Sequence, residues 1–90
     1  MSRILARVTG MVQGVGFRYF IMHKATTYGL YGYVRNCHDG DVEVEAEGNQ
    51  EKLISLIEDL RQGPHLSEVK DVKVEWFEEE KGYRTFTLRA

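Results

Sequence analysis

The sequence is poor in the residues that mark several large classes of protein. It has one proline and one cysteine, Cys37, in 90 residues. A single cysteine excludes an internal disulfide, so we expect a reducing compartment, the cytoplasm. No apolar run approaches the length of a membrane span. The first residues lead directly into an alternating strand pattern, without the apolar stretch of a signal peptide.

An excess of positive charge is also missing. Twelve Lys and Arg residues stand against fourteen Asp and Glu, for a formal net charge of −2. Composition therefore gives no reason to expect a nucleic-acid or membrane partner. The histidines at positions 23, 38 and 65 are too far apart to suggest a metal site. The 42% apolar fraction predicts one folded domain over residues 1–90, and we expect a monomer.

Hydrophobic periodicity predicts the order strand, helix, strand, strand, helix, strand, followed by a terminal strand. The strands are expected at residues 3–9, 31–36, 42–46, 69–77 and 85–89. One helix opens near Phe17 and ends at Gly29, and the other begins after Asn49 and ends at Gly63. This order predicts an α+β fold, a ferredoxin-like sandwich with an antiparallel sheet and both helices on one face. Right-handed crossovers place the first and third strands centrally.

The third predicted strand shows which face of the sheet is buried. Val42, Val44 and Ala46 alternate with glutamates at positions 43, 45 and 47. We expect the apolar residues to face the helices and the glutamates to lie on a solvated open face. The acidic turn at 78–82 is expected to be a solvated loop.

A glycine-rich loop, Gly10-Met11-Val12-Gln13-Gly14-Val15-Gly16-Phe17-Arg18, joins the first strand to the first helix. Its glycines let consecutive N–H groups approach an anion closely, and the positive end of the helix dipole faces the same point. Arg18 adds a guanidinium suited to phosphate oxygens. The loop thus predicts a phosphate site built from Gln13, Gly14, Val15, Gly16, Phe17 and Arg18. A tight strand–helix turn with an exposed arginine fits the spacing equally well.

The common phosphate-binding motifs do not fit this loop. The dinucleotide fingerprint needs a glycine where Tyr19 stands, and the P-loop needs Lys-Ser or Lys-Thr where Phe17-Arg18 follow Gly16. A loop with a nucleophilic cysteine is excluded because Val12 occupies that position. The predicted site therefore binds an anion without a side-chain nucleophile.

Asn36 is the second candidate of the site. It ends the strand at 31–36, just before a turn through Asp39-Gly40. From the end of the sheet its carboxamide could accept a hydrogen bond from water and donate one to a phosphate oxygen. Asparagines before such turns more often form the turn itself. The position of Asn36 alone leaves both interpretations open.

Two motifs together point to a family: Gly10-x-Val12-Gln13-Gly14-Val15-x-Phe17-Arg18 and Gly32-x-Val34-x-Asn36-x-x-Asp39-Gly40-x-Val42-Glu43. The chain strongly resembles the acylphosphatases over essentially its whole length. The resemblance implies hydrolysis of the carboxyl–phosphate bond of small acyl phosphates, without metal or cofactor. It also implies that Arg18 binds phosphate, that Asn36 orients the attacking water, and that the amides of residues 13–18 cradle the phosphate. Inorganic phosphate is the expected product and inhibitor.

Two other functions are compatible with the predicted fold. RNA-binding domains share this strand–helix order, but Glu43, Glu45 and Glu47 would repel RNA phosphates on the open face. Acylphosphatase-like domains also occur in larger carbamoyl-transfer enzymes, so a non-catalytic phosphate-binding or carbamoyl-phosphate-handling module is the closer alternative. We favour the free-standing enzyme because no partner domain accompanies the 90 residues.

Overall fold

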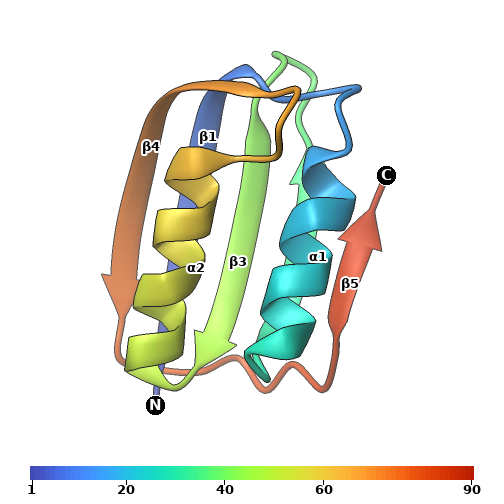
Figure 1. Ribbon diagram of the computed structural model, residues 1–90. Coiled ribbons are helices and arrows are strands. Elements are labelled where there is room, and N and C mark those ends of the chain that lie inside the picture. The colour runs from blue at the N-terminus through green and yellow to red at the C-terminus, as the bar shows by residue number, and fades with distance from the viewer.

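Strands and helices follow one another in the predicted order in the computed structural model, which describes residues 1–90 (Figure 1). Their bounds are β1 Ser2–Met11, α1 Phe17–Thr27, β2 Tyr31–Asn36, β3 Val42–Gly48, α2 Gln50–Gln62, β4 Glu68–Phe77 and β5 Phe86–Arg89. The strands form one sheet in the order β4-β1-β3-β2-β5, and both helices cover the same face. The ferredoxin-like arrangement is confirmed, with β1 and β3 inside the sheet.

The expectation of a wholly antiparallel sheet needs correction at the last strand. β1, β2, β3 and β4 pair antiparallel, whereas β5 pairs parallel with β2, with Val34 opposite Leu88. Figure 1 shows the reason. β4 ends at the lower end of the sheet, residues 78–85 cross there to the opposite edge, and β5 must then run upward beside β2.

The helix ends follow from local sequence. Gly29 adopts a left-handed φ of 71° after α1. This lets its N–H donate to the Thr26 carbonyl at 3.1 Å while the Leu30 N–H donates to the Ala25 carbonyl at 2.9 Å. The pair of bonds is a Schellman motif, which satisfies carbonyls at the helix C-terminus. At α2, the Asn49 side chain accepts from the Lys52 amide at 3.2 Å, as a predicted N-cap should.

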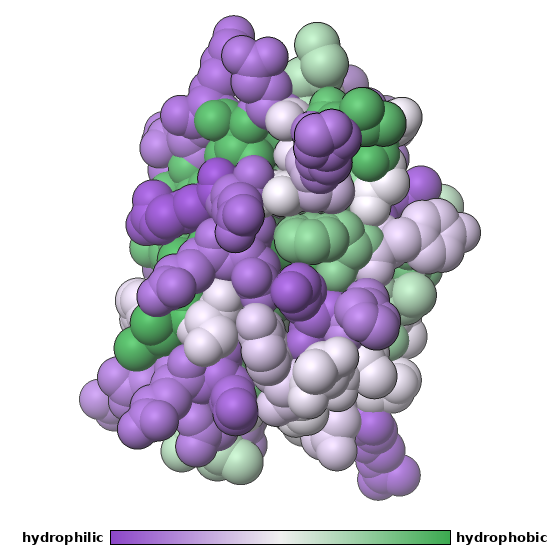
Figure 2. All heavy atoms as spheres, viewed as in Figure 1, coloured by the Kyte–Doolittle hydropathy of each residue, from purple (hydrophilic) through white to green (hydrophobic).

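The hydrophobic core lies between the sheet and the two helices. Eighteen buried residues form it, and the inward residues of β3, Val42, Val44 and Ala46, are completely inaccessible. The buried stripe of α2 is the predicted one: Leu53, Leu56, Ile57 and Leu60. Its outward side is mostly hydrophilic, and Figure 2 shows apolar groups on this face only as separate patches. Neither helix is long and apolar enough to cross a membrane.

The open face of the sheet is less solvated than expected. Glu45 and Glu47 are 2% and 3% exposed, because the segment 78–85 lies against them. Glu47 accepts hydrogen bonds from the amides of Lys81 at 2.7 Å, Gly82 at 3.0 Å and Tyr83 at 2.9 Å. The Glu47 carboxylate therefore holds the backbone of this segment to β3, although the side chains at 78–80 are exposed as predicted.

Glu45, unlike Glu47, binds charged side chains. Its carboxylate lies 2.9 Å from the Arg3 guanidinium and 3.1 Å from the Lys81 ammonium, and it accepts a short hydrogen bond from the Tyr83 hydroxyl. Burial by itself would raise the pKa of Glu45. The Tyr83 and Lys81 hydrogen bonds, with the nearby positive charges, outweigh burial and hold this pKa below its ordinary value.

The lowered pKa of Glu45 predicts a loss of stability in acid. The folded protein binds this proton less tightly than the unfolded chain, so the stabilisation is complete above the ordinary pKa of 4.5 and is lost as pH falls through the lower folded-state value. We expect Glu45→Gln to cost about 1–3 kcal/mol near neutral pH, mainly because it leaves the largely buried Arg3 guanidinium without its counter-charge. It should also make the decline of the urea midpoint below pH 5 shallower.

Glu80→Gln is the matched control, because Glu80 belongs to the same segment and is exposed. Its urea midpoints should follow the unmodified protein at every pH. Identical acid profiles for Glu45→Gln and the unmodified protein would contradict the assignment.

Candidate active site

The loop between β1 and α1 is built around two left-handed glycines. Gly14 and Gly16 have φ values of 74° and 79°. A Cβ atom at either position would meet nothing within 4 Å, so the backbone conformation rather than lack of space requires glycine there. Left-handed residues next to right-handed ones turn successive N–H groups toward one concave side, the arrangement that binds anions.

The amides of this loop are unpaired. Residues 13–19 donate no backbone hydrogen bond within the protein, and the first pairing is from the Phe20 amide to the Gly16 carbonyl at 3.0 Å. No side chain caps α1, and its first turn holds no acidic residue. The positive end of the helix dipole and its free N–H groups therefore point at one place without internal neutralisation.

Phe17 fixes this loop to the rest of the protein. The residue is 1% exposed and its ring belongs to the core, and it also lines the cavity described below. Val15 also packs against the core. Burial of the Phe17 ring is worth about 1.5–3 kcal/mol, and it holds the first turn of α1 at a fixed height above the sheet.

Arg18 lies in that first turn and reaches toward β5. One guanidinium nitrogen, Nη1, donates to the Arg89 carbonyl at 2.7 Å. Arg18 takes part in none of the protein's ion pairs. A guanidinium carries five donors, so most of them, with the full positive charge, are available to a ligand.

Asn36 meets the loop and Arg18 at one cavity. The cavity has a volume of about 180 Å³ and is lined by Val12, Gly14, Gly16, Phe17, Arg18, Tyr19 and Asn36. The turn bond expected as an alternative for Asn36 is made instead by Asp39, whose Oδ1 accepts from the Asp41 amide at 3.0 Å. The Asn36 carboxamide forms no hydrogen bond with the protein and is free to meet a ligand.

Gln13 contributes in a way that its sequence position did not reveal. Its Nε2 donates to the carbonyls of Cys37 and Asp41, both at 2.8 Å. These acceptors belong to the turn that follows Asn36, so one side chain ties the loop to the β2–β3 hairpin. Gln13 and Val15 are the two predicted loop residues that do not line the cavity. No local pattern could identify this contact, because its acceptors lie 24 and 28 residues away.

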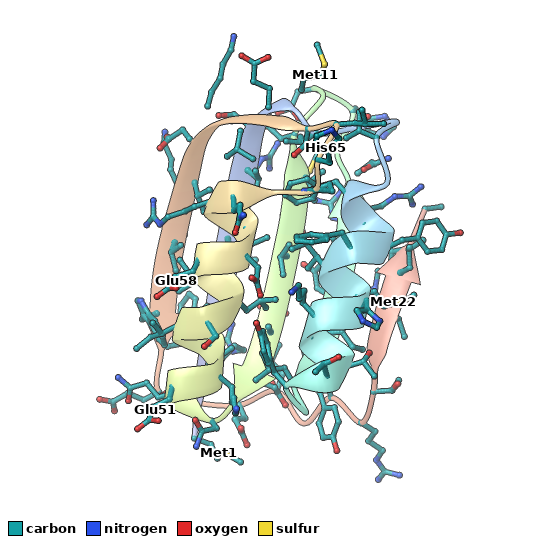
Figure 3. All side chains as sticks on the ribbon, in the orientation of Figure 1. Met1, Met11, Met22, Glu51, Glu58 and His65 are labelled. Carbon is teal, nitrogen blue, oxygen red and sulfur yellow. The ribbon has the colours of Figure 1, made fainter.

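A larger hollow of about 650 Å³ lies at the same end of the sheet, beside Met11, which Figure 3 places opposite Met1 and Glu51. Its lining includes the carboxylates Asp39, Asp41 and Glu68, which outnumber the nearby cations, Lys70 in the lining and Arg7 paired with both aspartates. A phosphate would be repelled there. The smaller cavity, with Arg18 and no carboxylate, is the better anion site.

No group of three or more His, Cys, Asp or Glu residues is arranged to hold a metal ion. His65 lies toward the loop end of the molecule in Figure 3, but no histidine lines the cavity. The polar side chains of the cavity are thus those of Arg18, Asn36 and Tyr19.

A model of the acylphosphatase family matches residues 4–88.

The chain belongs to the acylphosphatase family. It is an enzyme that hydrolyses acyl phosphates.

Similar proteins agree with this assignment over the whole chain. An acylphosphatase of Thermus thermophilus is 48% identical over 88 residues, which cover 96% of this chain and all of the relative. The crystal structure of acylphosphatase from Bacillus subtilis has a TM-score of 0.97 at 38% identity, with complete coverage of both chains. The structure of HypF from T. kodakarensis has a TM-score of 0.85 at 32% identity. It matches 99% of this chain but 12% of that one.

The two Gln13 hydrogen bonds predict that Gln13 positions the loop at this candidate site. Gln13→Ala should weaken the binding of inorganic phosphate roughly tenfold, because losing two bonds of about 1 kcal/mol each lets the loop move relative to Asn36. Titration calorimetry with inorganic phosphate measures the effect. Gln62→Ala, an exposed change at the C-terminal end of α2 and outside the cavity, should bind phosphate as the unmodified protein does. Unchanged affinity in Gln13→Ala would show that the hairpin does not position the loop.

Proposed function

We propose that this enzyme hydrolyses the carboxyl–phosphate bond of small acyl phosphates in the cavity between the β1–α1 loop and Asn36. One observation carries the proposal. The unpaired amides of the loop, the Arg18 guanidinium, which takes part in no ion pair, and the unpaired Asn36 carboxamide from the end of β2 meet at one cavity of about 180 Å³.

The amides of residues 13–18 and the Arg18 guanidinium hold the phosphoryl group. Gly14, Gly16, Phe17 and Arg18 line the cavity directly, and the hydrogen bond from Arg18 to the Arg89 carbonyl keeps the guanidinium over it. Donors fixed before the substrate arrives stabilise charge without reorganising during the reaction. Bidentate guanidinium–phosphate contacts also set the orientation of the phosphoryl group.

Asn36 orients the attacking water. Its carbonyl oxygen accepts a hydrogen bond from the water, while its NH₂ group donates to a phosphate oxygen. The water oxygen attacks phosphorus, and the bond from phosphorus to the acyl oxygen breaks with its electrons on the departing carboxylate. Acyl phosphates have a good leaving group, so positioning and charge stabilisation supply most of the catalysis.

No carboxylate or imidazole lines the cavity to accept the proton of the water. In the proposed mechanism this proton passes to an oxygen of the phosphoryl group itself. The products are then a carboxylate and inorganic phosphate, and the latter occupies the same donors as an inhibitor. The side chains of the cavity include no ordinary metal ligand set, which supports a reaction without metal or cofactor.

We further propose that residues 1–90 act as one catalytic domain, a monomer in the cytoplasm, without a nucleic-acid or membrane partner. The net charge of −2 and the scattered apolar patches of Figure 2 support this. RNA binding is disfavoured because the segment 78–85 covers Glu45 and Glu47 on the face where bases would stack. A carbamoyl-phosphate-handling module is disfavoured because the T. thermophilus acylphosphatase is matched along its full length.

Phosphate release from acetyl phosphate and benzoyl phosphate, measured with and without a chelator, tests the reaction directly. Both substrates should release phosphate at rates that the chelator does not change. Failure to release phosphate from both substrates would overturn the proposed function. Loss of activity with the chelator would overturn the metal-free mechanism alone.

Asn36→Ala should lower kcat by about 10²–10³, the usual cost of losing one preorganised group of this kind, with a smaller change in KM. Asn49→Ala is the matched control. It removes the α2 cap and should cost about 1 kcal/mol of stability while leaving kcat unchanged. Full turnover of benzoyl phosphate by Asn36→Ala would refute the assignment of the water to Asn36.

Arg18→Lys should impair both phosphate binding and turnover, because an ammonium keeps the charge but loses the planar, bidentate donors. The measurement is the inhibition constant of inorganic phosphate together with kcat. Arg61→Lys, an exposed change in α2, should alter neither. Tight competitive inhibition of Arg18→Lys by inorganic phosphate would contradict the proposed contact.

A further inference from the structure

Tyr19 lines the cavity but has no role in the proposed reaction. It follows Arg18 in the first turn of α1, and its side chain is 66% exposed. It contributes to the cavity wall, yet its hydroxyl forms no hydrogen bond with the protein and its ring takes part in no aromatic or cation–π contact. A large aromatic side chain is thus presented to solvent at the mouth of the site.

The direction of the substrate shows what would meet this ring. Three phosphate oxygens face the loop amides and Arg18 in the proposed mechanism, so the fourth oxygen and the acyl group extend toward the mouth. The other apolar side chains of the lining cannot meet the acyl group, because Val12 and Phe17 are each 1% exposed. Gly14 and Gly16 have no side chain. Tyr19 is therefore the only lining residue that offers accessible apolar surface to an acyl group.

We propose that Tyr19 is a specificity-determining residue that packs against the acyl group and favours flat, apolar acyl phosphates over acetyl phosphate. The inference rests on the proposed function and names the substrate class of the same site. An aromatic ring gains from contact with a planar partner both by burial of apolar area and by offset stacking or edge-to-face contact. An acetyl group is too small to cover much of the ring, so it gains little.

The test compares kcat/KM for benzoyl phosphate and acetyl phosphate in four proteins: the unmodified enzyme, Tyr19→Ala, Tyr19→Phe and Tyr31→Ala. Tyr19→Ala should lower kcat/KM for benzoyl phosphate about tenfold and for acetyl phosphate less than twofold. Tyr19→Phe should keep the preference of the unmodified enzyme, because the ring rather than the hydroxyl makes the contact.

Tyr31→Ala is the matched control, since Tyr31 is also an exposed tyrosine, 46% accessible, but lies outside the cavity. It should leave both substrates unaffected. The inhibition constant of inorganic phosphate should be the same in Tyr19→Ala and the unmodified enzyme, because phosphate lacks the acyl group.

Failure of this inference is distinguishable from failure of the proposed function. If the unmodified enzyme releases phosphate from neither substrate, the function itself is wrong. If it hydrolyses both, while Tyr19→Ala changes the two equally or changes neither, the acyl contact with Tyr19 is wrong. A loss of preference in Tyr19→Phe equal to that in Tyr19→Ala would also overturn it, by assigning the effect to the hydroxyl.

Discussion

The unneutralised positive end of α1 is the constraint on which the site depends. Seven consecutive amides, from Gln13 to Tyr19, remain without an internal acceptor, and the first turn of α1 contains no acidic residue. Such a group of donors is useful only if it is held still, since a mobile loop would turn its N–H groups to water. The buried Phe17 ring holds it from below, and Gln13 holds it from the side through the turn after β2.

The position of the guanidinium depends on the opposite face of the sheet. Glu47 accepts hydrogen bonds from three backbone amides of the segment 78–85, and Glu45 binds the side chains of Tyr83 and Lys81 in the same segment. This segment delivers β5 to the edge beside β2, where the Arg89 carbonyl accepts from Arg18. Buried carboxylates far from the cavity thus help to fix the cation that faces it. Because the folded state holds the pKa of Glu45 below its ordinary value, acid should also lower the stability of the fold.

The cavity itself is chemically simple, and this simplicity matches the reaction. It offers donors, one positive charge and one carboxamide, without a nucleophile or a group suited to accept a proton at neutral pH. Hydrolysis of a reactive anhydride needs little more than a fixed phosphoryl group and a fixed water. The larger, acidic hollow beside Met11 shows that size alone does not identify the site, because a phosphate dianion is attracted by charge and free N–H groups.

The sequence by itself determined the order of the elements, both helix ends, the inward faces of β3 and α2, and the identity of the glycine loop. These features depend on neighbours along the chain, through periodicity and the left-handed freedom of glycine. Only the tertiary structure decided that β5 runs parallel to β2, that Glu45 and Glu47 are buried, and that Gln13 binds the hairpin. Each of these depends on partners at least 24 residues away, whose approach is set by the crossing of the chain rather than by any local pattern.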